Sequence, residues 1–390
     1  MVDGSGVWGL RAGSEMTIVG VPREVKVDEH RVAITPDGVR ELARHGVEVV
    51  IERGAGADSA IPDADYAAAG ARLVPVAANV WDQADLICKV KEPQPEEYAH
   101  LREGLVVFAY FHLAAYRDVA EALLAGGVTA VAYETVQTAD GELVLLAPMS
   151  EVAGRMSVQI GAHFLERHNG GRGVLMGGAP GVQPARVVVL GAGNVGWNAA
   201  WIAAGMEAEV NLLDLDLDRL RWVDQIHRGR ITTLASNHGS VERVVADADL
   251  VIGAVLVPGG RAPTVVTGEM VRDMKPGAVI VDVAVDQGGC IETTRETTHH
   301  EPTFVRHGVL HYGVSNIPGA VPHTSTHALT NATLPYLTAL ALDGVAGATA
   351  ARPELVPGVN TCAGVITNPA VAQALGREHV PLGEALKPAS

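Results

Sequence analysis

Short apolar runs alternate with amphipathic stretches along the first third of the chain. Glycine or proline bounds most of these segments. Such alternation predicts parallel strands joined by right-handed helical crossovers, and therefore an α/β domain. The expected strands cover residues 17–21, 47–52, 84–93, 104–112 and 129–136, and the expected helices cover 36–46, 67–71, 95–101 and 117–127.

Two long helical patterns interrupt this series and predict connectors between domains. The first covers residues 150–171 and opens with a capping signal at Ser150 and Glu151. The second covers residues 325–344, where Pro335 is expected to bend the helix. Between them lies a second αβ series, with apolar runs at 185–190, 209–214, 249–255, 277–286 and 309–318. This order predicts that the chain leaves its first domain, builds a second one and returns to the first.

A glycine-rich turn follows the first strand of the second series. Residues 191–196 (GAGNVG) have the spacing of dinucleotide-binding turns, in which a pyrophosphate lies at a helix N-terminus. Asp214 ends the next strand, where a carboxylate accepts hydrogen bonds from the ribose hydroxyls and repels a 2′-phosphate. We therefore expect a Rossmann-type domain over residues 146–322 that prefers NAD to NADP. Arg219 leaves a contact with a 2′-phosphate as an alternative.

The fold class expected from this order is α/β, with the Rossmann-type domain inserted into a second α/β domain. Residues 16–145 and 323–390 are expected to form that second, substrate-binding domain, and two long helices are expected to join the domains. Residues 1–15 contain no sustained apolar core, so we expect a disordered extension and not a secretory signal.

Composition and charge narrow the class of protein. The 390 residues carry a formal charge of −16, which argues against a general nucleic-acid or anionic-membrane binder. The three cysteines lack paired spacing, so neither a disulfide scaffold nor a four-thiolate zinc site is expected, and a cytoplasmic location is favoured. We also find no run of about 20 apolar residues that predicts a membrane span.

Polar residues at the ends of the expected strands are the candidates for chemistry. Ligands of open α/β sheets bind outside the carboxyl ends of the strands. Lys91, His112 and Asp286 lie at such ends, and Arg31 precedes an expected helix start. Three of these residues also have an ordinary alternative, namely a surface charge for the two cations and a structural role for His112. A structural role is favoured for Asp282, which lies deeper in its strand.

Ten short sequence segments, spread from about Met16 to the C-terminal tail, together match the pattern of a known family in the same order. The segments are VPREVKVDEHRVAITPDGV, KVKEP, FHLAA, YETVQ, APMSEVAGRM, GGRGVLMGG, GAG with its downstream Asp214, GAVLVPG, VDVAVDQGGC and STHALTNATLPY. In these segments the chain resembles bacterial L-alanine dehydrogenases, within the alanine dehydrogenase/transhydrogenase-like family. The resemblance covers nearly the whole chain and both expected domains.

The resemblance implies an NAD-dependent enzyme that reversibly converts L-alanine into pyruvate and ammonia. Hydride transfer from the α-carbon would give an imine, which water would convert into a carbinolamine. By the same resemblance, Arg31 and Lys91 would bind the substrate, His112 would be the acid/base, and Asp286 would help to activate water. The implied assembly is a homohexamer. The residues expected to contact NAD are Ser150, Gly191, Gly193, Gly196, Asp214, Arg219, Ser236, Val255, Leu256, Val283, Arg295 and Asn316.

One departure from the family and three alternatives remain at the level of sequence. Some members of the family have an acidic residue and a histidine late in the second connector, which could together bind magnesium. This chain has Ala339 and Asp343 at the corresponding turn, so we expect no metal site. The first alternative is the NAD-binding component of a membrane transhydrogenase. The others are a related amino-acid or opine dehydrogenase and a non-catalytic NAD-binding protein.

Overall fold

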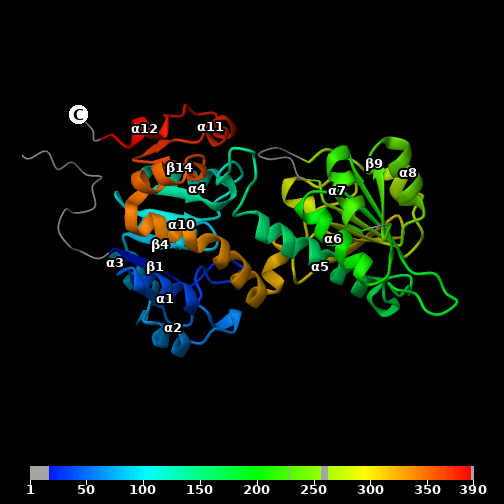
Figure 1. The fold of residues 1–390 in the computed structure, drawn as a ribbon, viewed down its shortest axis with the longest axis horizontal. Helices are drawn as coiled ribbons and strands as arrows, with labels where there is room; N and C mark the ends of the chain where they lie inside the picture. Colours follow the sequence, from blue (N-terminus) through cyan, green and yellow to red (C-terminus); the bar gives the residue numbers. More distant parts are fainter. Residues whose placement is uncertain (1–16, 228, 256–261, 388–390) are drawn as a thin grey trace, which may run out of the picture. The chain divides into compact units, whose positions relative to one another are not determined.

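The structure is a computed structural model that describes residues 17–227, 229–255 and 262–387. The chain divides into two compact units (Figure 1). Unit 1 combines Met1–Met149 with Val321–Ser390, and unit 2 is Ser150–Ala320. The extension expected over residues 1–15 lies outside the described residues.

An eight-stranded sheet forms the centre of unit 1, in the order β15-β14-β6-β5-β4-β1-β2-β3. Strands β1 to β6 pair with one another in parallel, whereas β14 is antiparallel to both β6 and β15. The strands are β1 (Ile18–Val21), β2 (Glu48–Glu52), β3 (Arg72–Val74), β4 (Leu86–Cys88), β5 (Val106–Ala109), β6 (Thr129–Ala132), β14 (Val359–Cys362) and β15 (Val365–Ile366).

Helices cover this sheet and connect its strands. The start of α1 illustrates the local chemistry, because the Thr35 side chain accepts a hydrogen bond from the Gly38 N–H and Pro36 occupies the first helical turn. The α-helices are α1 (Pro36–Arg44), α2 (Asp63–Ala69), α3 (Ala77–Gln83), α4 (Arg117–Ala125), α10 (Pro322–Ala351), α11 (Pro369–Leu375) and α12 (Leu382–Ala385). Short 3₁₀ helices are η1 (Ala57–Ser59), η2 (Pro95–His100), η3 (Tyr133–Thr135) and η7 (Pro353–Leu355).

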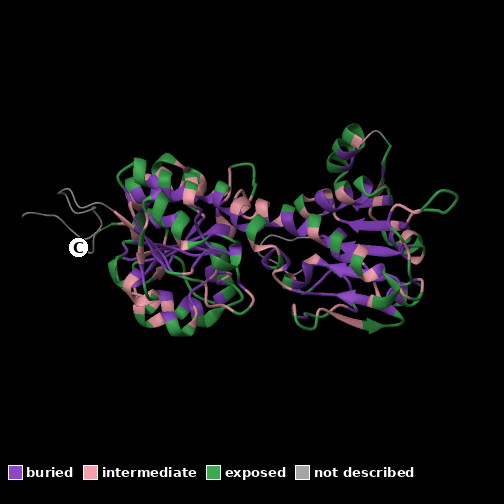
Figure 2. Cartoon of the chain, turned by 90° about the horizontal axis from the view of Figure 1, so that it is seen from below, coloured by how far each residue is buried: buried purple, intermediate pink, exposed green. Residues whose placement is uncertain are grey.

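A seven-stranded sheet forms the centre of unit 2, in the order β12-β13-β11-β10-β7-β8-β9. All neighbours are parallel except the antiparallel pair β12 and β13. The buried strands run through the middle of the unit (Figure 2). The seven strands of the sheet, of which β9 and β12 are largely outside the core, are β7 (Arg186–Leu190), β8 (Glu209–Asp214), β9 (Ile231–Ala235), β10 (Leu250–Gly253), β11 (Val279–Asp282), β12 (Thr303–Arg306) and β13 (Val309–Tyr312).

Small residues let the helices of unit 2 pack closely on its sheet. A Cβ atom at Gly161, in the helix that enters unit 2, would lie 2.4 Å from a Leu250 methyl group in β10. Four alanines of α6 are buried in the same core. The helices are α5 (Ala147–Leu165), α6 (Asn194–Gly205), α7 (Leu217–His227), α8 (His238–Ala246), α9 (Gly268–Arg272), η4 (Arg167–Asn169), η5 (Val283–Gln287) and η6 (Ile317–Ala320).

Helix α10 is longer than the sequence pattern predicted. It covers 30 residues, encloses Pro335, and leaves helical geometry at Gly344, where φ is 63°. Among the described residues, α10 is also the one helix that is long and apolar enough to cross a membrane. The apolar runs of the sequence did not predict such a helix. It packs against α1, η1 and η7 within unit 1, and many of its side chains are buried there. Its hydropathy therefore matches the packing of a core helix.

Candidate functional site

The predicted substrate residues of unit 1 lie at the carboxyl edge of its parallel strands. Strand β1 pairs with β2 on one side and β4 on the other, so the strand order reverses between β1 and β4. Arg31 lies in the loop after β1, Lys91 lies three residues after β4, and His112 lies three residues after β5. Loops at such a reversal leave room for a ligand. The fold thus brings these side chains to one edge of the sheet.

A buried ion pair fixes the Arg31 side chain. The guanidinium donates to the two carboxylate oxygens of Glu29, over 2.6 Å from Nε and 2.5 Å from Nη2. Its Nη1 donates to the Met149 sulfur at 3.0 Å. Burial raises the pKa of Glu29, but the charge and the hydrogen bonds of Arg31, together with the charge of Lys91, outweigh burial and lower this pKa to about 2. Arg31 is only 2% exposed and is therefore held in place before any ligand binds.

Three cationic side chains, Arg31, Lys26 and Lys91, lie around this edge. Lys26 Nζ donates to Glu92 Oε1 at 2.5 Å. Lys91 Nζ lies 5.9 Å from the centre of the Tyr110 ring. Burial and the nearby charge of Arg31 lower the pKa of Lys91. The edge therefore combines desolvation with positive charge, an environment that favours an anionic group of a ligand.

His112 is positioned by its backbone and by an aromatic neighbour. Its φ is +52°, in the left-handed region that non-glycine residues seldom adopt. Its ring lies nearly parallel to Tyr110, with the ring centres 5.9 Å apart. Burial, followed by the charges of Lys91, Lys26 and Arg31, lowers the pKa of His112 to about 3. The imidazole is therefore neutral at physiological pH and can accept a proton.

A second buried ion cluster is centred on Lys89, in the segment that joins β4 to Lys91. Lys89 is fully buried, and its Nζ lies 3.2 Å from Glu24 Oε2 and 3.0 Å from Glu97 Oε1. Glu24 also accepts a hydrogen bond from the Val90 N–H at 2.6 Å. Burial raises the pKa of Glu24 to about 7 although Lys89 opposes this effect. The cluster therefore anchors the backbone that carries Lys91.

The glycine-rich turn of unit 2 also lies where the strand order reverses, because β7 pairs with β8 on one side and β10 on the other. Gly191 has φ of +99°, and a Cβ atom at Gly196 would lie 1.7 Å from the Gly191 carbonyl oxygen. Gly193 lies directly before α6, and a Cβ atom there would meet only the end of the Arg219 side chain, at 3.8 Å. The turn therefore fits a dinucleotide, with space in front of the α6 N-terminus for a pyrophosphate.

Asp214 joins this turn to the end of the neighbouring strand. Its Oδ2 accepts a hydrogen bond from the Ala192 N–H at 2.5 Å, and its Oδ1 accepts one from the Asp216 N–H at 2.8 Å. Arg219 Nη1 lies 3.9 Å from Asp214 Oδ2. The Ser236 N–H donates to the Asp214 carbonyl oxygen at 2.8 Å. The two predicted side chains Asp214 and Arg219 thus lie next to each other beside the turn.

The other predicted NAD contacts lie at several places in unit 2. Ser150 lies within the first turn of α5, and Leu256 lies outside the described residues. Asn316, with φ of +59°, accepts a hydrogen bond at its carbonyl oxygen from His299 Nε2 at 3.4 Å. Arg295 is exposed and lies over the Phe304 ring. The two remaining predicted contacts follow strands β10 and β11, namely Val255 and Val283.

Asp286 lies in η5 at the carboxyl end of β11, and its side chain is exposed. The buried Asp282 anchors this segment, because its carboxylate accepts hydrogen bonds from the N–H groups of Ala284, Cys290 and Ile291 at 3.1 to 3.3 Å. The structural role expected for Asp282 agrees with these contacts. The strand itself ends at Asp282, earlier than the apolar run to Asp286 predicted.

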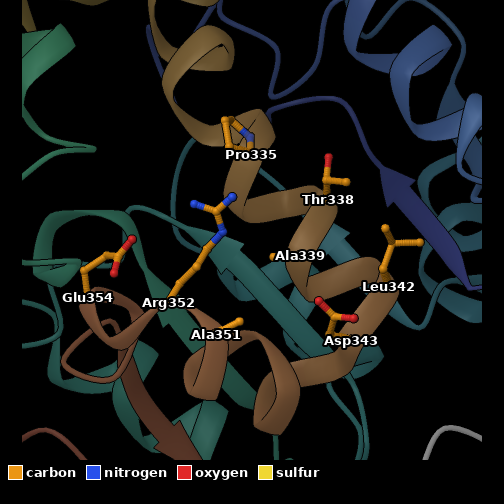
Figure 3. Close-up of a pocket in the computed structure, with 8 residues that line it drawn as sticks. All are labelled: Pro335, Thr338, Ala339, Leu342, Asp343, Ala351, Arg352 and Glu354. Atoms are coloured by element: carbon orange, nitrogen blue, oxygen red, sulfur yellow. The ribbon is translucent and has the colours of Figure 1, made fainter.

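A pocket of about 420 Å³ lies elsewhere in unit 1, between α10 and η7 (Figure 3). Its lining includes Ala339 and Asp343, the two positions at which the sequence led us to expect no metal site. Ala339 offers no side-chain donor atom. In the described ranges, no group of three or more His, Cys, Asp or Glu side chains is arranged to hold a metal ion. The predicted catalytic residues do not line this pocket.

Sequence reasoning missed the buried carboxylates that hold the cationic residues and His112. Glu29 could have been recognised by its position two residues before Arg31. Glu24 lies just after the first strand, where a carboxylate is seldom buried without a partner. Glu134 lies in η3, which directly follows β6, but the segment that contains it was assigned to a strand.

Comparisons with known proteins find a matching family model for each of the two units. The family model "Alanine dehydrogenase/PNT, N-terminal domain" matches residues 20–153, and "Alanine dehydrogenase/PNT, C-terminal domain" matches residues 157–369. An alanine dehydrogenase of Mycolicibacterium smegmatis is 56% identical over 92% of this chain and 96% of its own length. One of Bacillus subtilis is 53% identical over 95% of this chain and 98% of its own length.

Two solved structures resemble the whole chain. A structure of L-alanine dehydrogenase superposes with a TM-score of 0.90 and 48% identity, covering 92% of this chain and 99% of the other. A transhydrogenase of Sinorhizobium meliloti reaches a TM-score of 0.77 at 29% identity, covering 90% and 99%. The α/β fold class expected from the sequence is confirmed. Because both family models match in order and together cover most of the residues, the chain belongs to the alanine dehydrogenase/PNT family.

Proposed function

We propose that this protein is an NAD-dependent L-alanine dehydrogenase, which reversibly deaminates L-alanine to pyruvate and ammonia. The observation that carries the proposal is the group formed by Arg31, Lys91 and His112 at the switch point of unit 1. In this group Arg31 and Lys91 are cations that can bind the carboxylate of a substrate, and His112 is a neutral base beside them. In this proposal, unit 1 is the substrate domain and unit 2 is the NAD-binding domain.

The glycine turn and Asp214 are the residues that hold the cofactor. The N-terminus of α6 would hold the pyrophosphate, and the Asp214 carboxylate would accept hydrogen bonds from the ribose hydroxyls. When bound, NAD supplies the hydride acceptor for the α-carbon of the amino acid. The other assigned contacts are Ser150, Arg219, Ser236, Val255, Leu256, Val283, Arg295 and Asn316.

Arg31 and Lys91 bind the carboxylate and the carbonyl region of the substrate. Glu29 fixes the Arg31 guanidinium, so little side-chain freedom is lost when the substrate binds. The lowered pKa of Lys91 reflects burial beside another cation, and a bound carboxylate relieves that repulsion. An amino acid with a free carboxylate therefore fits this charge arrangement better than a neutral molecule.

His112 moves the protons of the reaction through an imidazole nitrogen. A bound substrate carboxylate offsets the charges of Lys91 and Arg31, and so raises the pKa of His112 from its low value in the free protein. The ring can then accept a proton in deamination and return it in the amination of pyruvate. Asp286 is assigned to the water molecule that converts the imine into pyruvate and ammonia.

The test is a steady-state assay of the purified protein in both directions. We expect NAD reduction that depends on L-alanine, and NADH oxidation that depends on both pyruvate and ammonia. His112→Ala is expected to lower turnover at least a hundredfold while the affinity for NAD changes less than twofold. Absence of activity in a protein that binds NAD normally would contradict the dehydrogenase assignment and favour the non-catalytic alternative.

We also propose a homohexamer in the cytoplasm, on the basis of the family resemblance. Six copies of the 40.6 kDa chain can be distinguished from a dimer or a tetramer by light scattering coupled to size exclusion. A monomer across the working concentration range would contradict the assembly.

A further inference from the structure

The backbone at His112 is bound by a carboxylate to which no role has yet been given. Glu134 Oε1 accepts a hydrogen bond from the His112 N–H at 2.6 Å and another from the Phe111 N–H at 3.2 Å. Its Oε2 lies 3.3 Å from the Phe111 nitrogen. Two successive N–H groups thus converge on one carboxylate, as in backbone nests that bind anions.

This contact coincides with an unusual backbone conformation. His112 has φ of +52°, and its carbonyl oxygen accepts hydrogen bonds from the N–H groups of Ala115 and Tyr116 at 2.8 and 3.1 Å. The left-handed conformation directs the imidazole differently from a continued β-strand, and the chain must be held in it. The carboxylate of Glu134 fixes the N–H side of the residue, while the following turn fixes its carbonyl side.

We propose that Glu134 is the positioning residue of the acid/base His112, acting as a hydrogen-bond acceptor for the backbone of residues 111 and 112. The proposal rests on the proposed dehydrogenase activity and on the role given to His112 in it. Glu134 does not touch the reacting atoms in this proposal. Its contribution is to keep the half-buried imidazole stacked beside the Tyr110 ring and within the influence of the nearby cations.

The neighbouring strands make Glu134 a rigid support. Strands β5 and β6 are paired in parallel up to Ala109 and Ala132, and Glu134 lies in the 3₁₀ turn that follows. The preceding residue, Tyr133, is fully buried, and its ring packs edge-on against the Tyr110 ring with centres 4.9 Å apart. Glu134 and His112 are thus attached to adjacent strands of one sheet.

The hydrogen bonds, and not the charge alone, explain this arrangement. Burial raises the pKa of Glu134, and the N–H groups of His112 and Phe111 oppose that effect. The cations around His112 dominate the electrostatics of its ring, because Lys91, Lys26 and Arg31 follow burial as causes of its low pKa. An uncharged acceptor of the same length should therefore preserve most of the function of Glu134.

The test compares three substitutions with opposite effects on charge and on acceptor position. Glu134→Gln removes the charge but leaves an amide oxygen at the length needed to accept the His112 N–H. Glu134→Asp keeps the charge but withdraws the oxygens by one methylene group, and Glu134→Ala removes both. Glu142→Ala, which truncates an exposed carboxylate in the loop after η3, is the matched control. Wild-type activity with L-alanine is measured first, so that a failure of the dehydrogenase assignment is seen separately.

We expect Glu134→Gln to keep at least about a third of the wild-type kcat, and Glu134→Asp and Glu134→Ala to lose tenfold or more. In the two impaired variants, the KM for NAD should change less than twofold. The kinetic pKa of the acid/base should move upward, because a displaced imidazole is less buried. The proposal is overturned if Glu134→Gln and Glu134→Asp lose kcat equally, if both keep it, or if the order is reversed. If Glu134→Ala does not fold, the comparison of the Gln and Asp variants decides.

Discussion

The contact between α6 and the glycine turn allows a direct test of the proposed NAD site, through the substitution Gly196→Ala. A Cβ atom at residue 196 would lie 1.7 Å from the Gly191 carbonyl oxygen and 3.3 Å from the Ala254 methyl group. An ordinary contact between a methyl carbon and a carbonyl oxygen is about 3.3 Å or longer. The backbone of the turn and the start of α6 must therefore separate by roughly 1.5 Å.

The cost follows from what such a displacement disturbs. Overpacking a tight site typically costs about 1–3 kcal/mol, and the contact with a rigid backbone oxygen places this site near the upper end. For a domain of the size of unit 2, a loss of about 3 kcal/mol corresponds to a decrease in Tm of about 6–12 °C. The same shift moves the N–H groups that face the pyrophosphate, so the KM for NAD should rise at least about tenfold.

Gly205→Ala is the matched control, because Gly205 lies at the end of the same helix and a Cβ atom there would have no neighbour within 4 Å. It should leave the KM for NAD unchanged and stabilise the protein by up to about 1 kcal/mol. Thermal unfolding and steady-state kinetics on the two variants give both quantities. If Gly196→Ala matched Gly205→Ala in Tm and in the KM for NAD, the close approach at the turn would have no functional importance.

Three other predictions follow from the charged residues. Asp214→Asn keeps an acceptor for the Ala192 N–H but removes the charge beside Arg219. The preference for NAD over NADP, measured as the ratio of the two kcat/KM values, should therefore fall at least about tenfold. An unchanged ratio would disprove the assignment of Asp214 to the ribose. Lys89→Met leaves Glu24 and Glu97 buried without their cation. This substitution should lower the free energy of unfolding, measured by urea titration, by about 3–5 kcal/mol. A loss below about 1 kcal/mol would show that the cluster does not stabilise the fold. Because the pKa of His112 falls from 6.5 to about 3 on folding, the unfolded chain binds more protons between these values. The wild type should therefore lose about 2 kcal/mol more stability than His112→Gln between pH 7 and pH 5, and equal losses would contradict the burial of a neutral imidazole.

The parts of the structure that the sequence predicted are those with a local signal. The glycine turn at 191–196 and helix α1 carry their own patterns, so the turn could be identified from its spacing and the helix was predicted from Pro36, although it ends at Arg44, two residues before the predicted end. The alternation of strands and helices also predicted the α/β fold class. Short strands such as β3 and β15 escaped, because three or two residues give no periodicity. The apolar run at 84–93 predicted a long strand, but β4 ends at Cys88, and Lys91 lies in the loop that follows.

The functional residues depend on contacts that no local pattern encodes. The ordinary alternative for Lys91 and Arg31 was a surface charge, but Arg31 is buried, Lys91 is half-buried, and burial and other charged groups shift the pKa of both. The partners Glu24 and Glu134 are brought to Val90 and His112 by the order of the strands, not by proximity in the sequence. The roles of the individual residues in catalysis stay predictions until the variants are measured.

The antiparallel pairing of β14 with β6 has a consequence for how the chain matures on the ribosome. Residues Thr129–Ala132 leave the ribosome with one side unpaired, and their partner Val359–Cys362 is made about 230 residues later. At synthesis rates of about 5–20 residues per second, the delay is on the order of 10–50 s. During that time the strand next to Glu134 and His112 is an open edge that can pair with another nascent chain. Slow translation between β6 and β14 should therefore lower the yield of native protein, even though every residue of the mature enzyme is unchanged.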